Sequence, residues 1–135
     1  YYDENLALLR QAGAELIEFS PLTSARLPDV DGVILGGGYP EIFAERLAAN
    51  ASLAEDLREH ARAGKPLYAE CGGLMYAARA IRTLDGREHA MLGLVPGTAV
   101  MHDARRALGY VEVEATSNSP LGPRGTRFRG HEFRY

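Results

Sequence analysis

The sequence predicts an α/β domain with a mostly parallel sheet and an appended antiparallel arm. Helix-like segments alternate with short apolar runs near residues 16, 34 and 68, which is the pattern of parallel βαβ units. Glycine clusters follow two of these runs, as they do where a strand turns sharply into a helix. From residue 107 onward, polar and apolar residues alternate, which is typical of half-exposed antiparallel strands.

The N-terminal segment predicts one helix followed by one strand. Apolar residues at helical spacing predict a helix over residues 4–12, with Asp3 as its N-cap and Gly13 as its stop. Residues 14–20 are expected to form a strand. Because a helix followed by a strand is the second half of a βαβ unit, we expect a further strand before residue 1.

The rest of the chain predicts alternating elements and then a hairpin-like arm. The expected strands cover residues 31–35, 67–69 and 91–95, with 98–101 as a further candidate. The expected helices cover residues 40–49, 52–63 and 74–81. Residues 107–116 and 126–135 are expected to pair as antiparallel strands across a turn-rich loop.

Composition narrows the class of protein. The 135 residues carry a net charge of −3, so no basic surface argues for binding to nucleic acid or an anionic membrane. No apolar run approaches the ~20 residues that a membrane span needs. A single cysteine excludes an internal disulfide, and nothing suggests secretion, so we expect a cytoplasmic protein.

The only cysteine, Cys71, stands between an expected strand and an expected helix, after Glu70 and before two glycines. A cysteine at such a turn points its sulfur out of the sheet and beside the positive end of a helix, which favours thiolate. This geometry resembles the nucleophile elbow of hydrolases. A small buried core residue is the alternative, and this residue alone leaves both interpretations open.

A glycine turn, Gly36-Gly37-Gly38, follows the 31–35 strand. It matches neither the dinucleotide-binding pattern nor a phosphate loop, which would need a lysine. It is either a flexible turn with no catalytic role, or a turn whose backbone N–H groups, together with that of Gly72, donate to an oxyanion. Because the carboxyl ends of parallel strands meet at one edge, this turn and Cys71 are expected to face one crevice.

A cysteine nucleophile needs a base, and the spacing of the four histidines does not select one. His60 is expected to be solvated, His89 lies in a charged turn, and His102 follows a strand end and could face a cleft. His131 stands beside Glu132, where a structural pair is the commoner role. Glu70 is expected to support the elbow and to need a partner if it is buried.

Several segments resemble, in order, the C-terminal class I glutamine amidotransferase domain of the cobyrinic acid a,c-diamide synthase family. They are Tyr1–Leu6, Leu35–Glu41, Tyr68–Tyr76, Gly109-Tyr110 and Arg129–Phe133. The resemblance implies a flavodoxin-like three-layer sandwich that hydrolyses glutamine through a cysteinyl thioester and releases ammonia. It also implies that Cys71 is the nucleophile and that Gly72 and Gly38, with Gly37, donate to the oxyanion. Met75 stands where the wider class often has glutamine, so recognition of the substrate side chain must partly differ.

The resemblance also implies partners outside this segment. Glutamine is the expected ligand of this domain, which is expected to hold no cofactor or metal of its own. An N-terminal synthetase domain would use ATP and Mg²⁺ to activate carboxylates of a tetrapyrrole (corrin) substrate. The family places the activating histidine beyond residue 135. We therefore expect residues 1–135 to be a partial and inactive domain, in which His131 and Glu132 support the arm or an interface.

Two other interpretations stay open. One is the amidotransferase domain of a related tetrapyrrole amidase, acting on cobyric acid precursors or nickel sirohydrochlorin, whereas the resemblance itself covers cobyrinate or hydrogenobyrinate. The other is a flavodoxin-like docking module that lacks a complete catalytic set.

Overall fold

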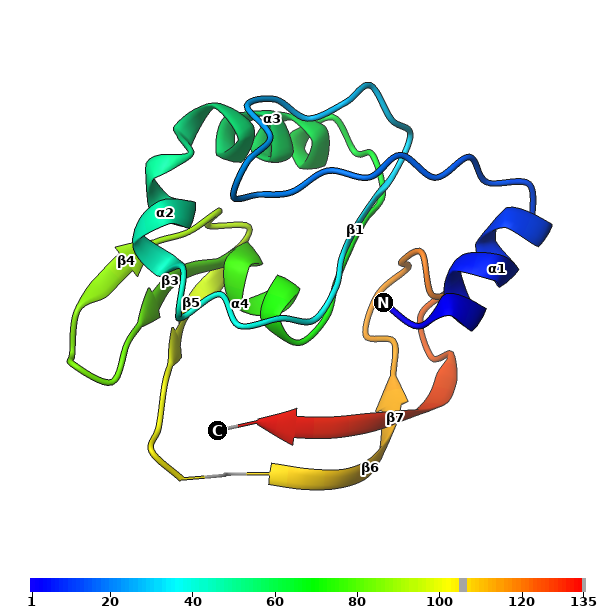
Figure 1. The fold of residues 1–135 in the computed structure, drawn as a ribbon. Coiled ribbons are helices and arrows are strands. Elements are labelled where there is room, and N and C mark those ends of the chain that lie inside the picture. The colour runs from blue at the N-terminus through cyan, green and yellow to red at the C-terminus, as the bar shows by residue number, and fades with distance from the viewer. Residues whose placement is uncertain (105–106, 135) are drawn as a thin grey trace.

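The computed structural model describes residues 1–104 and 107–134, which form a mixed α/β structure (Figure 1). The helices of the described residues are α1 (Asp3–Gln11), α2 (Ala44–Ala49), α3 (Ala51–Arg62) and α4 (Gly72–Ala77). The strands are β1 (Val33–Leu35), β2 (Leu67–Ala69), β3 (Ala78–Arg82), β4 (Glu88–Ala90), β5 (Val95–Val100), β6 (Ala107–Glu114) and β7 (Arg127–Arg134).

The described strands form three separate small sheets. β1 and β2 are parallel, with Val33 opposite Leu67 and Leu35 opposite Ala69. β3 lies between β4, to which it is antiparallel, and β5, to which it is parallel. β6 and β7 form the antiparallel arm, which in Figure 1 lies on the side of α1 and apart from α2, α3 and the other two sheets. The single mostly parallel sheet of a flavodoxin-like sandwich stays a prediction.

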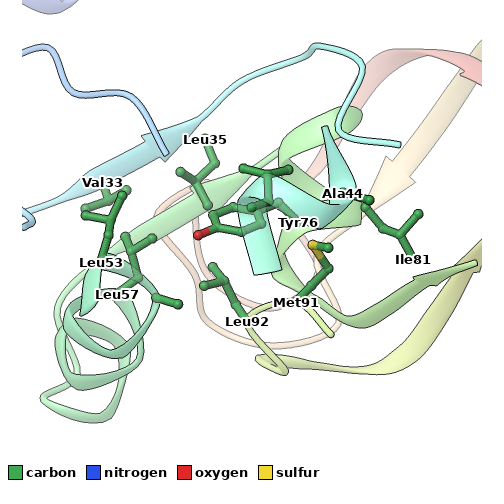
Figure 2. Close-up of a cluster of buried hydrophobic side chains, with 11 residues drawn as sticks. Val33, Leu35, Ala44, Leu53, Leu57, Tyr76, Ile81, Met91 and Leu92 are labelled. Atoms are coloured by element: carbon green, nitrogen blue, oxygen red, sulfur yellow. The ribbon is translucent and has the colours of Figure 1, made fainter. Parts of the chain in front are cut away.

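The core lies where β1, α3, α4 and the segment after β4 meet (Figure 2). Leu53 and Leu57 present the apolar face of α3 and are fully buried, together with Ile81 and Leu92. Their spacing of four residues places both leucines on one side of the helix. This packing holds β1 and α4 beside each other, and both elements border the candidate site.

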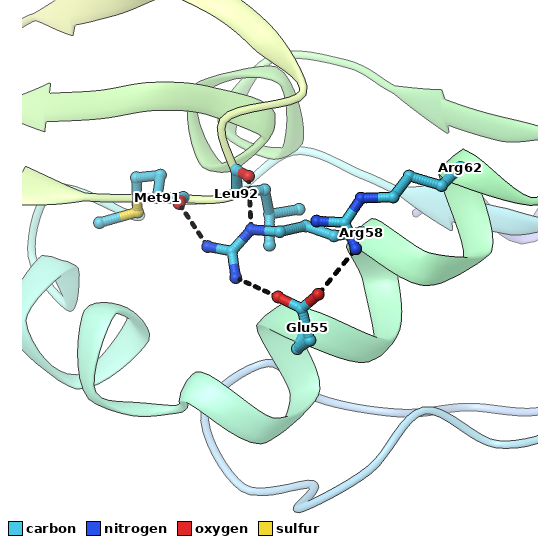
Figure 3. Close-up of polar contacts among 5 residues, drawn as sticks. All are labelled: Glu55, Arg58, Arg62, Met91 and Leu92. Atoms are coloured by element: carbon cyan, nitrogen blue, oxygen red, sulfur yellow. Dashed lines mark hydrogen bonds and ion pairs between the residues drawn. The ribbon is translucent and has the colours of Figure 1, made fainter.

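Arg58 fastens the segment after β4 to α3 (Figure 3). Its guanidinium donates to the backbone oxygens of Leu92 at 2.8 Å and Met91 at 3.1 Å. Glu55 accepts from Arg58 at 3.0 Å and from Arg62 at 2.7 Å. Because residues 91–94 lie outside the strands, these side-chain bonds satisfy carbonyls that no ladder reaches.

Several predicted elements are confirmed with small changes in their bounds: α1, α3, β1, β2, β6 and the described part of β7. Gly13 and Gly64 follow their helices at φ +92° and +74°, as expected of stop residues. The N-cap prediction is wrong, because Tyr2 takes that position and Asp3 is the first helical residue. α2 begins at Ala44, since residues 40–43 form turns. Residue 135, the last residue of the predicted second arm strand, lies outside the described residues.

The predicted strand at 14–20 is wrong. The segment has no helix or strand assignment, although Phe19 packs against the core. A strand exists only through hydrogen bonds to a neighbouring strand, and residues 14–20 pair with none of the described strands. An apolar pattern in one segment cannot supply that partner.

The candidate strand at 98–101 is confirmed as part of β5 (Val95–Val100), whereas the predicted bounds of the preceding helix and strand are wrong. The helix expected over 74–81 begins at Gly72 and ends at Ala77, after which β3 begins. Residues 91–94, expected to be a strand, form none, and β5 runs from Val95 through Pro96. A register shift between β3 and β5 beside Pro96 accommodates the proline, which cannot donate to the ladder.

Candidate active site

Cys71 forms a strained turn between β2 and α4. Its backbone has φ 49° and ψ −119°, and it is the one non-glycine residue with positive φ among the described residues. Such a conformation costs a side-chain-bearing residue of order 1–3 kcal/mol and persists only where its surroundings impose it. Glu70 N–H donates to Leu35 O at 3.0 Å, and Gly73 N–H donates to Glu70 O at 2.9 Å. These bonds hold the turn, and Cys71 remains exposed.

Two buried glycines bring α4 against the turn that follows β1. A Cβ on Gly72 would lie 2.6 Å from Gly38 O and 2.9 Å from Gly38 N. A Cβ on Gly73 would overlap the backbone of Leu35. Gly73 N–H also donates to Gly36 O at 2.9 Å. Only glycine permits this approach of two backbones.

The glycine turn lies beside the sulfur. A Cβ on Gly37 would lie 3.8 Å from the Sγ of Cys71 and 3.7 Å from its Cβ. The thiol, the Gly72 backbone and the turn therefore share one location, as the prediction of a common crevice requires. Met75, one turn further along α4, is half-buried and packs against the core.

Glu70 is exposed in the structure. The sequence left open that its carboxylate is buried, and it is not. Its partner is Tyr68, two residues earlier on the same side of the strand, whose hydroxyl donates to Glu70 Oε2 at 2.9 Å. Burial of Tyr68, and then its bond to Glu70, raise the pKa of the Tyr68 phenol. The pair lies directly before the elbow.

The histidines occupy different surroundings. His60 is only 6% exposed, and its Nε2 lies 3.1 Å from Pro66 O, so the prediction of a solvated side chain is wrong. His131 lies on β7 and packs edge-on against Tyr110, with ring centroids 6.0 Å apart. Its neighbour Glu132 is half-buried in the same strand, opposite Gly109. Both residues belong to the arm and not to the end of β2, where Cys71 lies.

His89 and His102 line an open recess of about 560 Å³ between α2 and the β3–β4 turn. His102 thus lines a recess whose walls include neither Cys71 nor the glycine turn. Asp85 lies in the same wall, and hydrogen bonds from the Thr83 hydroxyl and from Arg87 lower its pKa to about 2.

Within residues 1–104 and 107–134, no group of three or more histidine, cysteine or acidic side chains is placed to hold a metal ion.

One contact at the site was not predicted from the sequence. The hydroxyl of Tyr1 donates to Ile34 O at 2.7 Å and accepts from Gly36 N–H at 3.0 Å. No local pattern signals this contact, because 33 residues separate Tyr1 from Ile34.

In the part of the chain that the structure describes, no helix combines the length and apolarity needed to cross a membrane.

Comparison with known proteins shows which family this chain resembles in sequence. Curated relatives named cobyrinate a,c-diamide synthase match this chain over its whole length. The relative from Leptospira interrogans serogroup Icterohaemorrhagiae serovar copenhageni is 53% identical over 135 residues, that from Syntrophotalea carbinolica 47% over 136, and that from Listeria monocytogenes serovar 1/2a 44% over 135. The chain spans 30% of the length of each of these relatives. A family model described as CobB/CobQ-like glutamine amidotransferase domain matches residues 1–135, and the chain belongs to that family.

Proposed function

We propose that this chain is the glutaminase part of an ATP-dependent cobyrinate or hydrogenobyrinate a,c-diamide synthase. Cobyrinate a,c-diamide synthase is the name that its relatives bear. The observation that carries the proposal is the strained turn at Cys71, whose sulfur lies beside Gly37 while Gly72 contacts Gly38. This is the arrangement that acyl transfer through a thiolate needs.

In the first half of the reaction, the Cys71 thiolate attacks the side-chain carboxamide carbon of glutamine. A carbon–sulfur bond forms, and the carbonyl electron pair moves onto oxygen. Backbone N–H groups of Gly72 and of Gly38, with Gly37, donate to that oxyanion. A histidine that has taken the thiol proton returns it to the leaving nitrogen, so ammonia departs and a thioester remains.

In the second half, the same histidine removes a proton from water, which attacks the thioester carbon. The carbon–sulfur bond breaks, glutamate leaves, and the thiolate is restored. We assign this base to a histidine outside residues 1–135. The contacts of two described histidines support the assignment, because His60 is buried against Pro66 and His131 packs on Tyr110.

The remaining predicted residues take supporting roles in this proposal. Glu70 accepts from Tyr68 and steadies the end of β2 directly before the nucleophile. His131 and Glu132 shape the arm.

Released ammonia would amidate tetrapyrrole carboxylates activated by ATP and Mg²⁺ in a separate synthetase domain. We place the reaction in the cytoplasm, where the catalytic thiol stays reduced.

Labelling with a diazoketone analogue of glutamine tests this proposal. The gene's full-length product is treated with the analogue, and its peptides are mapped by mass spectrometry. We expect an adduct on Cys71 that glutamine blocks and that Cys71→Ser abolishes. Iodoacetamide, which alkylates accessible thiols without a glutamine site, is the control. Labelling of Cys71 by iodoacetamide but not by the analogue would overturn the glutaminase and favour a docking module.

A further inference from the structure

The glycine turn at 36–38 is fixed by backbone hydrogen bonds on the side where it leaves β1. Leu35 O accepts from Glu70 N–H at 3.0 Å, and Gly36 O accepts from Gly73 N–H at 2.9 Å. Glycine loses more conformational freedom on folding than any other residue. A turn of three glycines that must hold one shape therefore needs a restraint on its other side as well.

Pro40 supplies that restraint through its ring. It is buried, although the three residues before it are exposed. A Cβ on Gly72 would lie 2.9 Å from Pro40 Cδ, and equally close to the backbone nitrogen of Gly38. The proline ring and the Gly38 backbone thus border the same side of Gly72, the first residue of α4.

Proline also restricts the backbone directly after the turn. The ring locks the φ of Pro40 near about −65°. A clash with its Cδ keeps the preceding residue, Tyr39, out of the helical region. Two successive residues with few accessible conformations therefore follow Gly38, and they limit the directions in which the glycines can move.

Pro40 is in turn attached to the core. Its C=O accepts from Phe43 N–H at 3.1 Å, and Phe43 O accepts from Leu47 N–H of α2 at 2.9 Å. Leu47 and Ala44 of α2 are buried among the core side chains, where Figure 2 shows Ala44. The glycine turn is consequently held between β1 and α4 on one side, and Pro40 and α2 on the other.

We propose that Pro40 is a positioning residue for the oxyanion site. It holds Gly38 against Gly72, so that the N–H groups of these two glycines keep a constant separation when the oxyanion forms. Pro40 has no N–H of its own to donate, so it acts through the two glycines. This inference rests on the proposed glutaminase reaction, because it assigns Pro40 a part in stabilising that reaction's oxyanion.

Pro40→Ala, made in the gene's full-length product, removes the ring and the restriction on φ but keeps a Cβ. Pro120→Ala is the matched control, because Pro120 is exposed in the loop between β6 and β7. Four quantities are measured for each variant: kcat and KM for glutamine hydrolysis, the inhibition constant of the γ-aldehyde of glutamate, and the rate of Cys71 alkylation by iodoacetamide. The thiolate adds to the aldehyde carbon and leaves an oxyanion, whereas iodoacetamide loses iodide without forming one.

For Pro40→Ala we expect kcat to fall about tenfold and the aldehyde to bind about tenfold more weakly, since a loosened turn misplaces the N–H donors. KM should stay within about twofold, because the donors act mainly once the oxyanion has formed. The alkylation rate should not change, which a general loss of structure could not produce. Pro120→Ala should leave all four quantities unchanged.

Equal kcat and aldehyde binding in the two variants would overturn the role of Pro40 while leaving the glutaminase intact. A parallel fall in the alkylation rate would overturn it too, by showing a general structural effect. So would a rise in KM at unchanged kcat, by showing a role in binding glutamine. If the unaltered protein hydrolyses no glutamine and takes no label from the diazoketone, the proposed function fails and this inference fails with it.

Discussion

Cys71 has a strained backbone, and the two residues that follow it, Gly72 and Gly73, have no side chains. A backbone with positive φ is unfavourable for cysteine. The hydrogen bonds made by Glu70 and Gly73 must therefore hold Cys71 in this conformation. The glycines at 72 and 73 are required for a different reason, since a Cβ at either would meet backbone atoms. Backbone atoms cannot move aside as the end of a flexible side chain can, so both positions are intolerant of any substitution.

Gly73→Ala should destabilise the domain by about 3 kcal/mol, because the new methyl group overlaps the backbone of Leu35 and forces α4 away from β1. Gly97→Ala is the control, because a Cβ there meets no atom within 4 Å. Pulse proteolysis in urea, performed on the gene's full-length product, measures both. Equal urea midpoints for the two variants would contradict the close approach of α4 and β1.

Among the elements, α3 uses its side chains to bind carbonyls of a segment that lies outside the described strands. Arg58 binds two consecutive carbonyls of residues 91–92, and Leu53 and Leu57 cover the same region with apolar atoms. The neighbouring Arg62 donates to the Glu55 carboxylate, and its side chain is 64% exposed. The two arginines therefore differ in what they stabilise, although they share Glu55.

Arg58→Met should cost about 1–3 kcal/mol of unfolding free energy, because the methionine keeps the apolar stem but leaves the Met91 and Leu92 carbonyls without their donor. Arg62→Met should change stability little, since an exposed ion pair contributes little. Urea unfolding of both variants, side by side, measures the difference. A larger loss for Arg62→Met would refute the assignment of Arg58 as the fastening residue.

Across the whole molecule, the arm (β6 and β7) differs from the rest of the chain in what stabilises it. The buried residues of the core belong to β1, the helices α2 to α4, β3 and the segment after β4. β6 and β7 pair with each other, and none of their side chains that the structure describes belongs to that core. A two-stranded ribbon has little stability of its own, whereas the core elements share one apolar interior.

Hydrogen exchange on the 135-residue chain should therefore show a difference between the two parts. Amides of the arm ladder, such as those around Tyr110 and His131, should exchange much faster than those of α3. The arm would open without unfolding the core. Exchange of both parts at one common rate would contradict this and show a single cooperative unit.

Much of the candidate site could be predicted from the sequence, because its parts depend on neighbouring residues. Cysteine followed by two glycines after an apolar run predicts a tight turn, and the structure has it at Cys71. The glycine turn at 36–38 was predicted to face it because both follow parallel strands, and Gly37 lies beside the sulfur. The alternation after residue 107 predicted the arm for the same local reason.

Local sequence patterns specify where the elbow, the glycine turn and the arm lie, since glycine placement and side-chain alternation act within a few residues. The tertiary structure alone decided that residues 78–82 form a strand, that His60 is buried, and that residues 14–20 have no ladder. It alone placed the Tyr1 hydroxyl against the backbone of Ile34 and Gly36. Each of these outcomes depends on hydrogen bonds or packing with a partner far along the chain, which no local pattern can specify.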